Sequence, residues 1–173
     1  MIPTKKVAVL RAFHKNPDLK KQLVAEVQKH RKADQIVRRT YGAVGCSIHS
    51  LNVRLRKDIP TNQHSAYPAE LGIPESLAHL EDYLFEAMPA DKAMLWPVEF
   101  MKAVPVGADL SLVPAKFICA VLRDIVKFKY VKDDEAVVKA VLDTAELWAR
   151  VANGEMVKDS EWSAAWSAAW SAA

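Results

Sequence analysis

The sequence predicts an all-α protein: a compact domain of roughly six to eight helices over residues 1–155, with an appended Ala/Trp-rich helix over 156–173. Three observations lead to this fold class. Apolar residues recur at spacings of three and four along most of the chain, which is typical of helices with one buried face. Sustained alternation of apolar and polar residues, the main signal for half-buried strands, is missing. The last twelve residues repeat the helix-favouring unit Trp-Ser-Ala-Ala.

The helices expected in the N-terminal half are bounded by glycine and by poor helix formers. Residues 18–33 carry leucines and valines at helical spacing. Gly42 and Gly45 are expected to bracket a turn, and a short helix follows over 46–55. Residues 58–67 contain helix breakers, so this segment is predicted to be irregular.

Further along the chain, prolines divide the predicted helices. One helix runs over 74–88 with leucines on its apolar face, and another covers 89–104. Pro97 lies inside the second and is expected to kink it or to mark its true start. Two more helices are predicted over 110–128 and 133–153, of which the last has the most regular apolar stripe.

The tail places Trp162, Trp166 and Trp170 at intervals of four residues. Side chains four apart lie on neighbouring turns of one helix face. Because a turn holds 3.6 residues, a strict period of four drifts by about 40° per repeat. We therefore expect a slowly winding aromatic ridge, which the domain, a second copy or a protein partner must cover.

Charge is distributed unevenly along the chain. Residues 1–58 carry fourteen Lys or Arg and four Asp or Glu, whereas residues 59–173 carry ten and seventeen. A basic half of this kind is typical of a protein that binds nucleic acid or an acidic partner. It is equally expected where a basic half folds against an acidic half of the same chain.

The two cysteines, Cys46 and Cys119, are too distant and too few to indicate a disulfide framework. They are expected to be reduced thiols in the cytoplasm. The longest stretch without a charged residue covers residues 40–53, which is too short and too polar to cross a bilayer. No membrane association is therefore predicted.

One region contains residue types that bind metals. Cys46 and His49 have the spacing of a ligand pair, His64 follows, and Glu81 and Glu86 lie on the predicted helix over 74–88. A divalent metal such as zinc, held by imidazoles with carboxylates or with Cys46, could activate water for hydrolysis. The alternative is a protein without cofactor, in which Cys46 is a small buried hydrophobe, the histidines are structural and the acidic helix face is solvated.

A second group of candidates consists of basic residues that could contact phosphates. Its members are Lys29, Arg31, Lys32, Arg38, Arg39, Arg54 and Arg56. Tyr41 is the one aromatic residue among them, so a platform for stacking single-stranded bases is not expected. The alternative is a solvated surface whose charges pair with the acidic half.

Several phrases resemble an uncharacterised family of phage and bacterial accessory proteins that end in Ala/Trp tetrapeptide repeats. They are GCSIHS (45–50), HSAY (64–67), ELGIP (70–74), LAHLEDYLFE (77–86), GADLSLV (107–113) and the repeat tail. Some proteins with such tails are labelled immunity proteins. The resemblance implies an accessory role against or alongside a host or competitor. It implies no catalytic residues, although the phrases concentrate around Cys46, His49, His64 and the region of Glu81 and Glu86.

The function predicted from these observations is a non-enzymatic protein-interaction module of the inhibitor, immunity or anti-defence type. It would bind a protein partner, which includes a second copy of itself joined through Trp162, Trp166 and Trp170. One alternative is a metal-dependent hydrolase with a His/Glu site. Another is a nucleic-acid-binding protein that uses the basic surface over 29–57.

Overall fold

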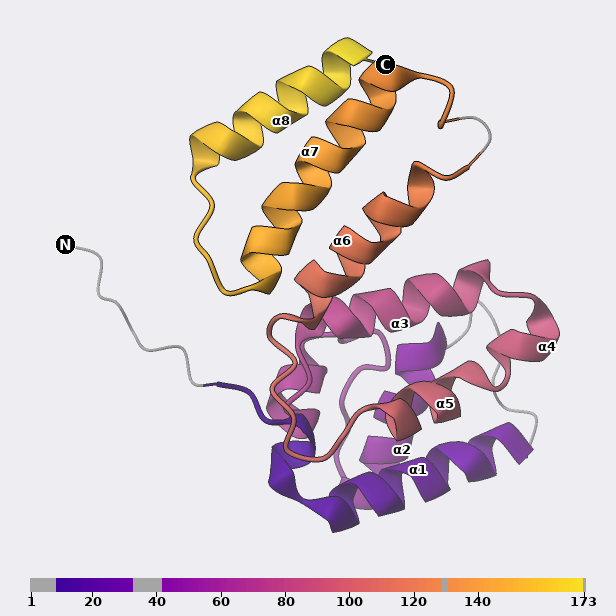
Figure 1. The fold of residues 1–173 in the computed structure, drawn as a ribbon. Helices are drawn as coiled ribbons and strands as arrows, with labels where there is room; N and C mark the ends of the chain where they lie inside the picture. The colour runs from indigo at the N-terminus through magenta and orange to yellow at the C-terminus, as the bar shows by residue number, and fades with distance from the viewer. Residues whose placement is uncertain (1–8, 33–41, 129–130, 173) are drawn as a thin grey trace. The chain divides into compact units, whose positions relative to one another are not determined.

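The computed structural model describes residues 9–32, 42–128 and 131–172, and the regular elements in these ranges are all helical (Figure 1). The prediction of an all-α fold is confirmed. The chain divides into two compact units, Met1–Ser111 and Leu112–Ala173. The sequence placed this division near residue 155 instead, because the apolar pattern over 110–153 does not show which helices pack together. None of the described helices is both long and apolar enough to span a membrane.

The first unit is built from short helices around a large apolar core, with a smaller second cluster of buried residues beside it. Its elements are η1 (Ala12–Lys15), α1 (Pro17–Lys32), α2 (Gly42–Leu55), η2 (Tyr67–Leu71), α3 (Glu75–Ala87), α4 (Ala90–Ala93) and α5 (Trp96–Ala103). Helix α2 packs against α1, α3 and α5. Its Val44, Ile48 and Leu51 are fully buried in the core. Helix α2 is therefore the central element of this unit.

Helix α2 begins four residues earlier than the sequence predicts. Gly42 and Gly45 do not bracket a turn, since both lie within the helix. Ala43 and Val44 are 0% exposed and pack into the core, so tertiary burial outweighs the weak helix propensity of the glycines. Helix α1 (Pro17–Lys32) agrees with its prediction to within one residue at each end.

Prolines set the boundaries of the helices that follow. The predicted helix over 89–104 is divided into α4 and α5, and Pro97 lies in the first turn of α5. A proline lacks the N–H that a helix interior requires, but this loss has no consequence in the first turn. The sequence did not predict η2, a single wide helical turn that ends at Gly72.

The second unit consists of α6 (Val113–Ile125), α7 (Glu135–Ala152) and α8 (Asp159–Ala172). The three helices lie side by side, and α7 packs against both α6 and α8 (Figure 1). Asp134 caps α7 by accepting hydrogen bonds from the N–H groups of Ala136 and Val137, both at 3.1 Å. A layer of three helices leaves much apolar surface uncovered. Its buried described side chains are all small: Ala115, Cys119, Ala140 and Ala145.

Candidate functional site

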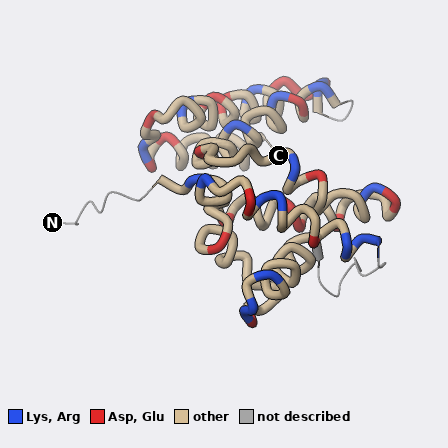
Figure 2. The backbone as a smooth tube through the Cα atoms, turned by 90° about the horizontal axis from the view of Figure 1, so that it is seen from below, with Lys and Arg blue, Asp and Glu red and all other residues tan. Residues whose placement is uncertain are grey.

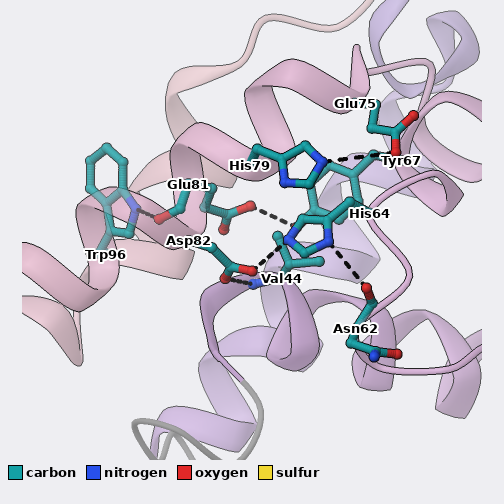
Figure 3. Close-up of polar contacts among 9 residues, drawn as sticks. All are labelled: Val44, Asn62, His64, Tyr67, Glu75, His79, Glu81, Asp82 and Trp96. Carbon is teal, nitrogen blue, oxygen red and sulfur yellow. Dashed lines mark hydrogen bonds and ion pairs between the residues drawn. The ribbon is translucent and has the colours of Figure 1, made fainter.

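A cluster of polar side chains lies where α2, η2 and α3 meet in the first unit (Figure 3). Helix α3 supplies Glu81 and Asp82, η2 supplies Tyr67, and the segment before η2 supplies His64. Three of the metal candidates, Cys46, His64 and Glu81, fall in or beside this cluster. These residues form the candidate site.

Glu81 is the inner member of the cluster and is 0% exposed. Its Oε2 accepts a hydrogen bond of 2.6 Å from the Tyr67 hydroxyl, which is also fully buried. Burial raises the pKa of Glu81 well above 4.5; the Tyr67 hydrogen bond opposes this, and the charge of Asp82 adds to it. The Glu81 carboxyl therefore stays protonated to a higher pH than an exposed glutamate does.

Two buried polar atoms beside Tyr67 make no hydrogen bond within the described part of the chain. They are Glu81 Oε1 and the Ser47 hydroxyl, which lies near Tyr67 without suitable hydrogen-bond geometry. Burial and the neighbouring Glu81 charge raise the pKa of Tyr67 well above 10. Because the groups that make up this core are fully buried, a substrate could reach them only if the helices separated.

Asp82 is the outer carboxylate of the cluster and joins two structural elements. Its Oδ1 accepts the backbone N–H of Val44, in the first turn of α2, at 2.9 Å. Its Oδ2 lies 2.7 Å from Nε2 of His64. The second ring nitrogen of His64 lies 3.1 Å from the carbonyl oxygen of Asn62. Both ring nitrogens thus face acceptors, and a doubly protonated ring donates to both.

His79 covers the outer side of this arrangement. Its ring stacks on that of His64, with centroids 4.1 Å apart and planes 11° from parallel. Its Nε2 lies 3.9 Å from the Glu75 carboxylate, one turn earlier on α3 (Figure 3). Parallel stacked imidazoles present their faces to each other, so the two rings do not direct their nitrogens at a common ion.

Among the described residues, neither Cys46, which borders the cluster, nor the other two candidates, His49 and Glu86, completes a set of metal ligands with it. The ring of His49 contacts that of His30 at 4.2 Å, and Glu86 is exposed on α3. Cys46 is 1% exposed, and burial raises the pKa of its thiol to about 12, with the charges of Glu81 and Asp82 adding to the effect. Within the described residues, no three His, Cys, Asp or Glu side chains are grouped so that they could hold a metal ion.

The basic candidates occupy several different environments. Lys29 pairs with Glu26 at 2.8 Å, and the buried Nε of Arg54 has no hydrogen-bond partner among the residues that the structure describes. Arg31, Lys32 and Arg56 are exposed, whereas Arg38 and Arg39 lie outside the described residues. Acidic and basic positions are interspersed along the described helices (Figure 2). Five of the seven candidates therefore have a described environment, and one of these, Lys29, is paired with an acidic side chain.

The three tail tryptophans have different environments. Trp162 packs against Trp148 of α7, with ring centroids 5.0 Å apart. Trp166 and Trp170 are 73% and 77% exposed. The drift of about 40° per repeat explains the difference, because it rotates each successive indole further from α7. The predicted ridge of three is thus one docked tryptophan followed by an exposed Trp pair, Trp166 and Trp170.

Sequence reasoning missed Tyr67 and assigned Glu81 to a possible metal site without predicting its burial. A signal for the burial of Glu81 was present: Glu81 lies four residues after Leu77 and four before Phe85, both of which are buried. No comparable pattern marks Tyr67, because η2 is one irregular turn. Comparison with protein-family models, curated proteins and solved structures finds no match to this chain.

Proposed function

We propose that this chain is a non-enzymatic protein-binding module that associates through the exposed Trp pair of α8. The observation that carries the proposal is that Trp166 and Trp170 are 73% and 77% exposed on a helix whose first tryptophan is docked. Tryptophan is among the residues most enriched at the energetic centres of protein interfaces. A contiguous aromatic surface of this kind is typical of a binding site rather than of a solvated face.

The composition of the second unit supports this proposal. Beyond the Trp pair, several large apolar side chains of this unit are more than a third exposed: Phe117 and Val121 on α6, Leu142 on α7, and Met156 between α7 and α8. A layer of three helices buries little of its own apolar surface, and binding to another protein would remove more of it from water.

The polar cluster of the first unit supports a structural role better than a catalytic one. Asp82 caps α2, His64 pairs with Asp82, and Tyr67 satisfies one oxygen of Glu81. Each of these contacts fixes one element to another. The inhibitor, immunity or anti-defence type of the module, and its phage or bacterial accessory origin, rest on the resemblance of residues 45–113 and of the repeat tail.

The test compares the Trp166→Ala/Trp170→Ala double variant with Tyr83→Ala. Tyr83 is a matched control because it is an aromatic residue of α3 with the same 77% exposure as Trp170. Each tagged protein is expressed in bacterial cells and purified gently after nuclease treatment, and its native mass is measured. We expect a complex heavier than the monomer for the wild type and Tyr83→Ala, but not for the double variant. A wild-type protein recovered as a monomer would overturn the proposal.

A further inference from the structure

The surface beside the exposed Trp pair is a hollow that suits an aromatic ring. Trp166, Ser167, Trp170 and Ser171 line an open depression of about 410 Å³ on α8. The Ser171 hydroxyl donates to the Ser167 carbonyl at 2.9 Å, and the Ser167 hydroxyl donates to the carbonyl of Ser163 at 3.0 Å. Both hydroxyls already donate a hydrogen bond within the helix. An apolar group that covers them therefore leaves no hydroxyl donor without an acceptor.

The electrostatics of α8 restrict what can cover this surface. Residues 162–172 contain no ionisable side chain. The charged residues of α8 are Asp159 and Glu161 in its first turn, and Glu161 is paired with Arg150 of α7. A charged partner surface would lose its hydration against the Trp pair and find no opposite charge there. The best partner is therefore itself neutral, and an uncharged surface of aromatic rings with small residues between them meets this requirement.

The same helix has those properties. Large and small residues alternate along it with a period of four, or about 6 Å. Two copies of such a surface match each other, because the spacing of the projections on one equals the spacing of the hollows on the other. We propose that the partner is a second copy of this chain, whose α8 packs antiparallel so that each exposed Trp pair fills the Ser167/Ser171 hollow of the other copy.

The antiparallel direction follows from the charges at the start of the helix. A parallel pair would bring two copies of Asp159 and two like helix termini together. An antiparallel pair separates them and places opposite ends of the helix dipoles side by side. The two-fold axis of the antiparallel pair runs across the helices, so both copies use the same surface and the pair closes as a dimer.

The exposed area is sufficient for a weak but specific dimer. Trp166 and Trp170 each retain about three quarters of their surface, or about 190 Å². Four such indoles, with the small residues around them, would bury about 1,000 Å² in total, which is at the low end of specific interfaces. We expect dissociation in the micromolar range.

The inference rests on the proposed protein-binding function, so its test uses purified full-length protein without any other component. Sedimentation velocity is measured from about 1 µM to about 300 µM. The wild type is expected to change from monomer to dimer and no further, with a blue shift in tryptophan emission over the same range. Trp166→Ala/Trp170→Ala should weaken dimerisation by at least about 100-fold, whereas Tyr83→Ala should not change it.

A second pair of variants keeps both tryptophans. Ser167→Asp places a charge in the hollow, and Ala168→Asp places the same charge about 100° further round the helix, outside the hollow. Ser167→Asp should abolish the dimer and Ala168→Asp should retain it.

The inference would be overturned if the wild type stays monomeric or forms open polymers. It would also be overturned if Ser167→Asp dimerises as strongly as the wild type. If the pure wild type is monomeric but still forms a heavier complex in cells through the Trp pair, the partner is a different protein and the proposed function stands. If it forms none, both fail.

Discussion

Asp82 of α3 accepts a hydrogen bond from the backbone N–H of Val44, in the first turn of α2, at 2.9 Å. Helix α2 is thus capped by a residue 38 positions further along the chain. Its first turn contains no acidic residue of its own. The carboxylate satisfies one of the backbone N–H groups that every helix start leaves unpaired, and its charge is favourable at that end of the helix dipole.

Replacing Asp82 should therefore destabilise the first unit. Asp82→Ala removes both the cap and the acceptor for His64, and we expect the free energy of unfolding to fall by about 2 kcal/mol. Asp82→Asn keeps an acceptor for the Val44 N–H and should cost about half as much. Urea denaturation monitored by circular dichroism gives both values. Equal losses in the two variants would show that the cap contributes nothing.

Glu81 gives the protein a specific dependence on pH. Its pKa is raised by burial, so the folded state holds a proton that the unfolded state releases above about pH 4.5. The free energy of unfolding should therefore fall as the pH rises from 4.5 towards the raised pKa. Glu81→Gln removes this proton, and its stability should change less than that of the wild type between about pH 5 and pH 8.

The comparison of slopes separates this effect from any packing loss in Glu81→Gln. Buried glutamine can still accept from the Tyr67 hydroxyl, so a constant offset between the two curves is expected and carries no information about the proton. Parallel curves over the whole range would mean that Glu81 does not bind its proton more tightly in the folded state.

Gly72 is required by a close approach of two backbone segments. It has φ of 62°, and a Cβ at this position would lie 2.2 Å from the carbonyl oxygen of Arg11. Gly72→Ala should cost at least about 3 kcal/mol, because the obstructing atom belongs to the backbone and cannot rotate away. Gly154→Ala is the control, since φ there is 84° but no atom of the described residues lies within 4 Å of the added Cβ; we expect a loss of about 1 kcal/mol. The stability of both variants is measured by thermal and urea denaturation. Similar losses of stability in Gly72→Ala and Gly154→Ala would contradict this assignment.

Local sequence pattern predicted the parts of this fold that are determined locally. Helices α1, α3 and α7 follow apolar spacing with Pro17, Pro74 and Asp134 at their starts, and the predicted bounds agree closely. The start of α2 could not be predicted in this way. It depends on a cap from Asp82 and on burial of Val44, both of which are contacts between distant residues.

The same distinction applies to the candidate site. The sequence grouped Cys46, His49 and His64 because they are close in number and chemically suited to a metal. In the fold, His49 turns to His30, while His64 turns to Asp82. Spacing along a chain does not determine which face of each helix packs against the next. The convergence of side chains from three elements could therefore not be predicted from residue spacing.

The two thiols should differ in reactivity. Cys46 is 1% exposed with a pKa raised to about 12, whereas Cys119 is 7% exposed and lines a depression of about 420 Å³ between α6 and α7. Because the thiolate is the reactive form, Cys46 should react with a thiol reagent at pH 8 only on unfolding. Cys119 should react at least about ten times faster in the native protein. Cys46→Ala and Cys119→Ala assign the phases, and native labelling of Cys46 first would show that the polar cluster opens.

The same Trp→Ala substitution should change the free energy of unfolding by very different amounts at two positions of the tail. Trp162 packs on Trp148, and the neighbouring Glu161 pairs with Arg150, so Trp162→Ala removes the contact that docks α8 on α7. We expect a loss of about 2 kcal/mol, less than for a fully buried tryptophan because Trp162 is half-buried. Trp170→Ala should change the free energy of unfolding by less than about 0.5 kcal/mol, since Trp170 is 77% exposed. Both are measured by urea denaturation at about 1 µM, where the proposed dimer is dissociated. A loss in Trp170→Ala equal to that in Trp162→Ala would mean that the Trp pair is covered within its own chain, which would remove the surface on which the proposed association depends.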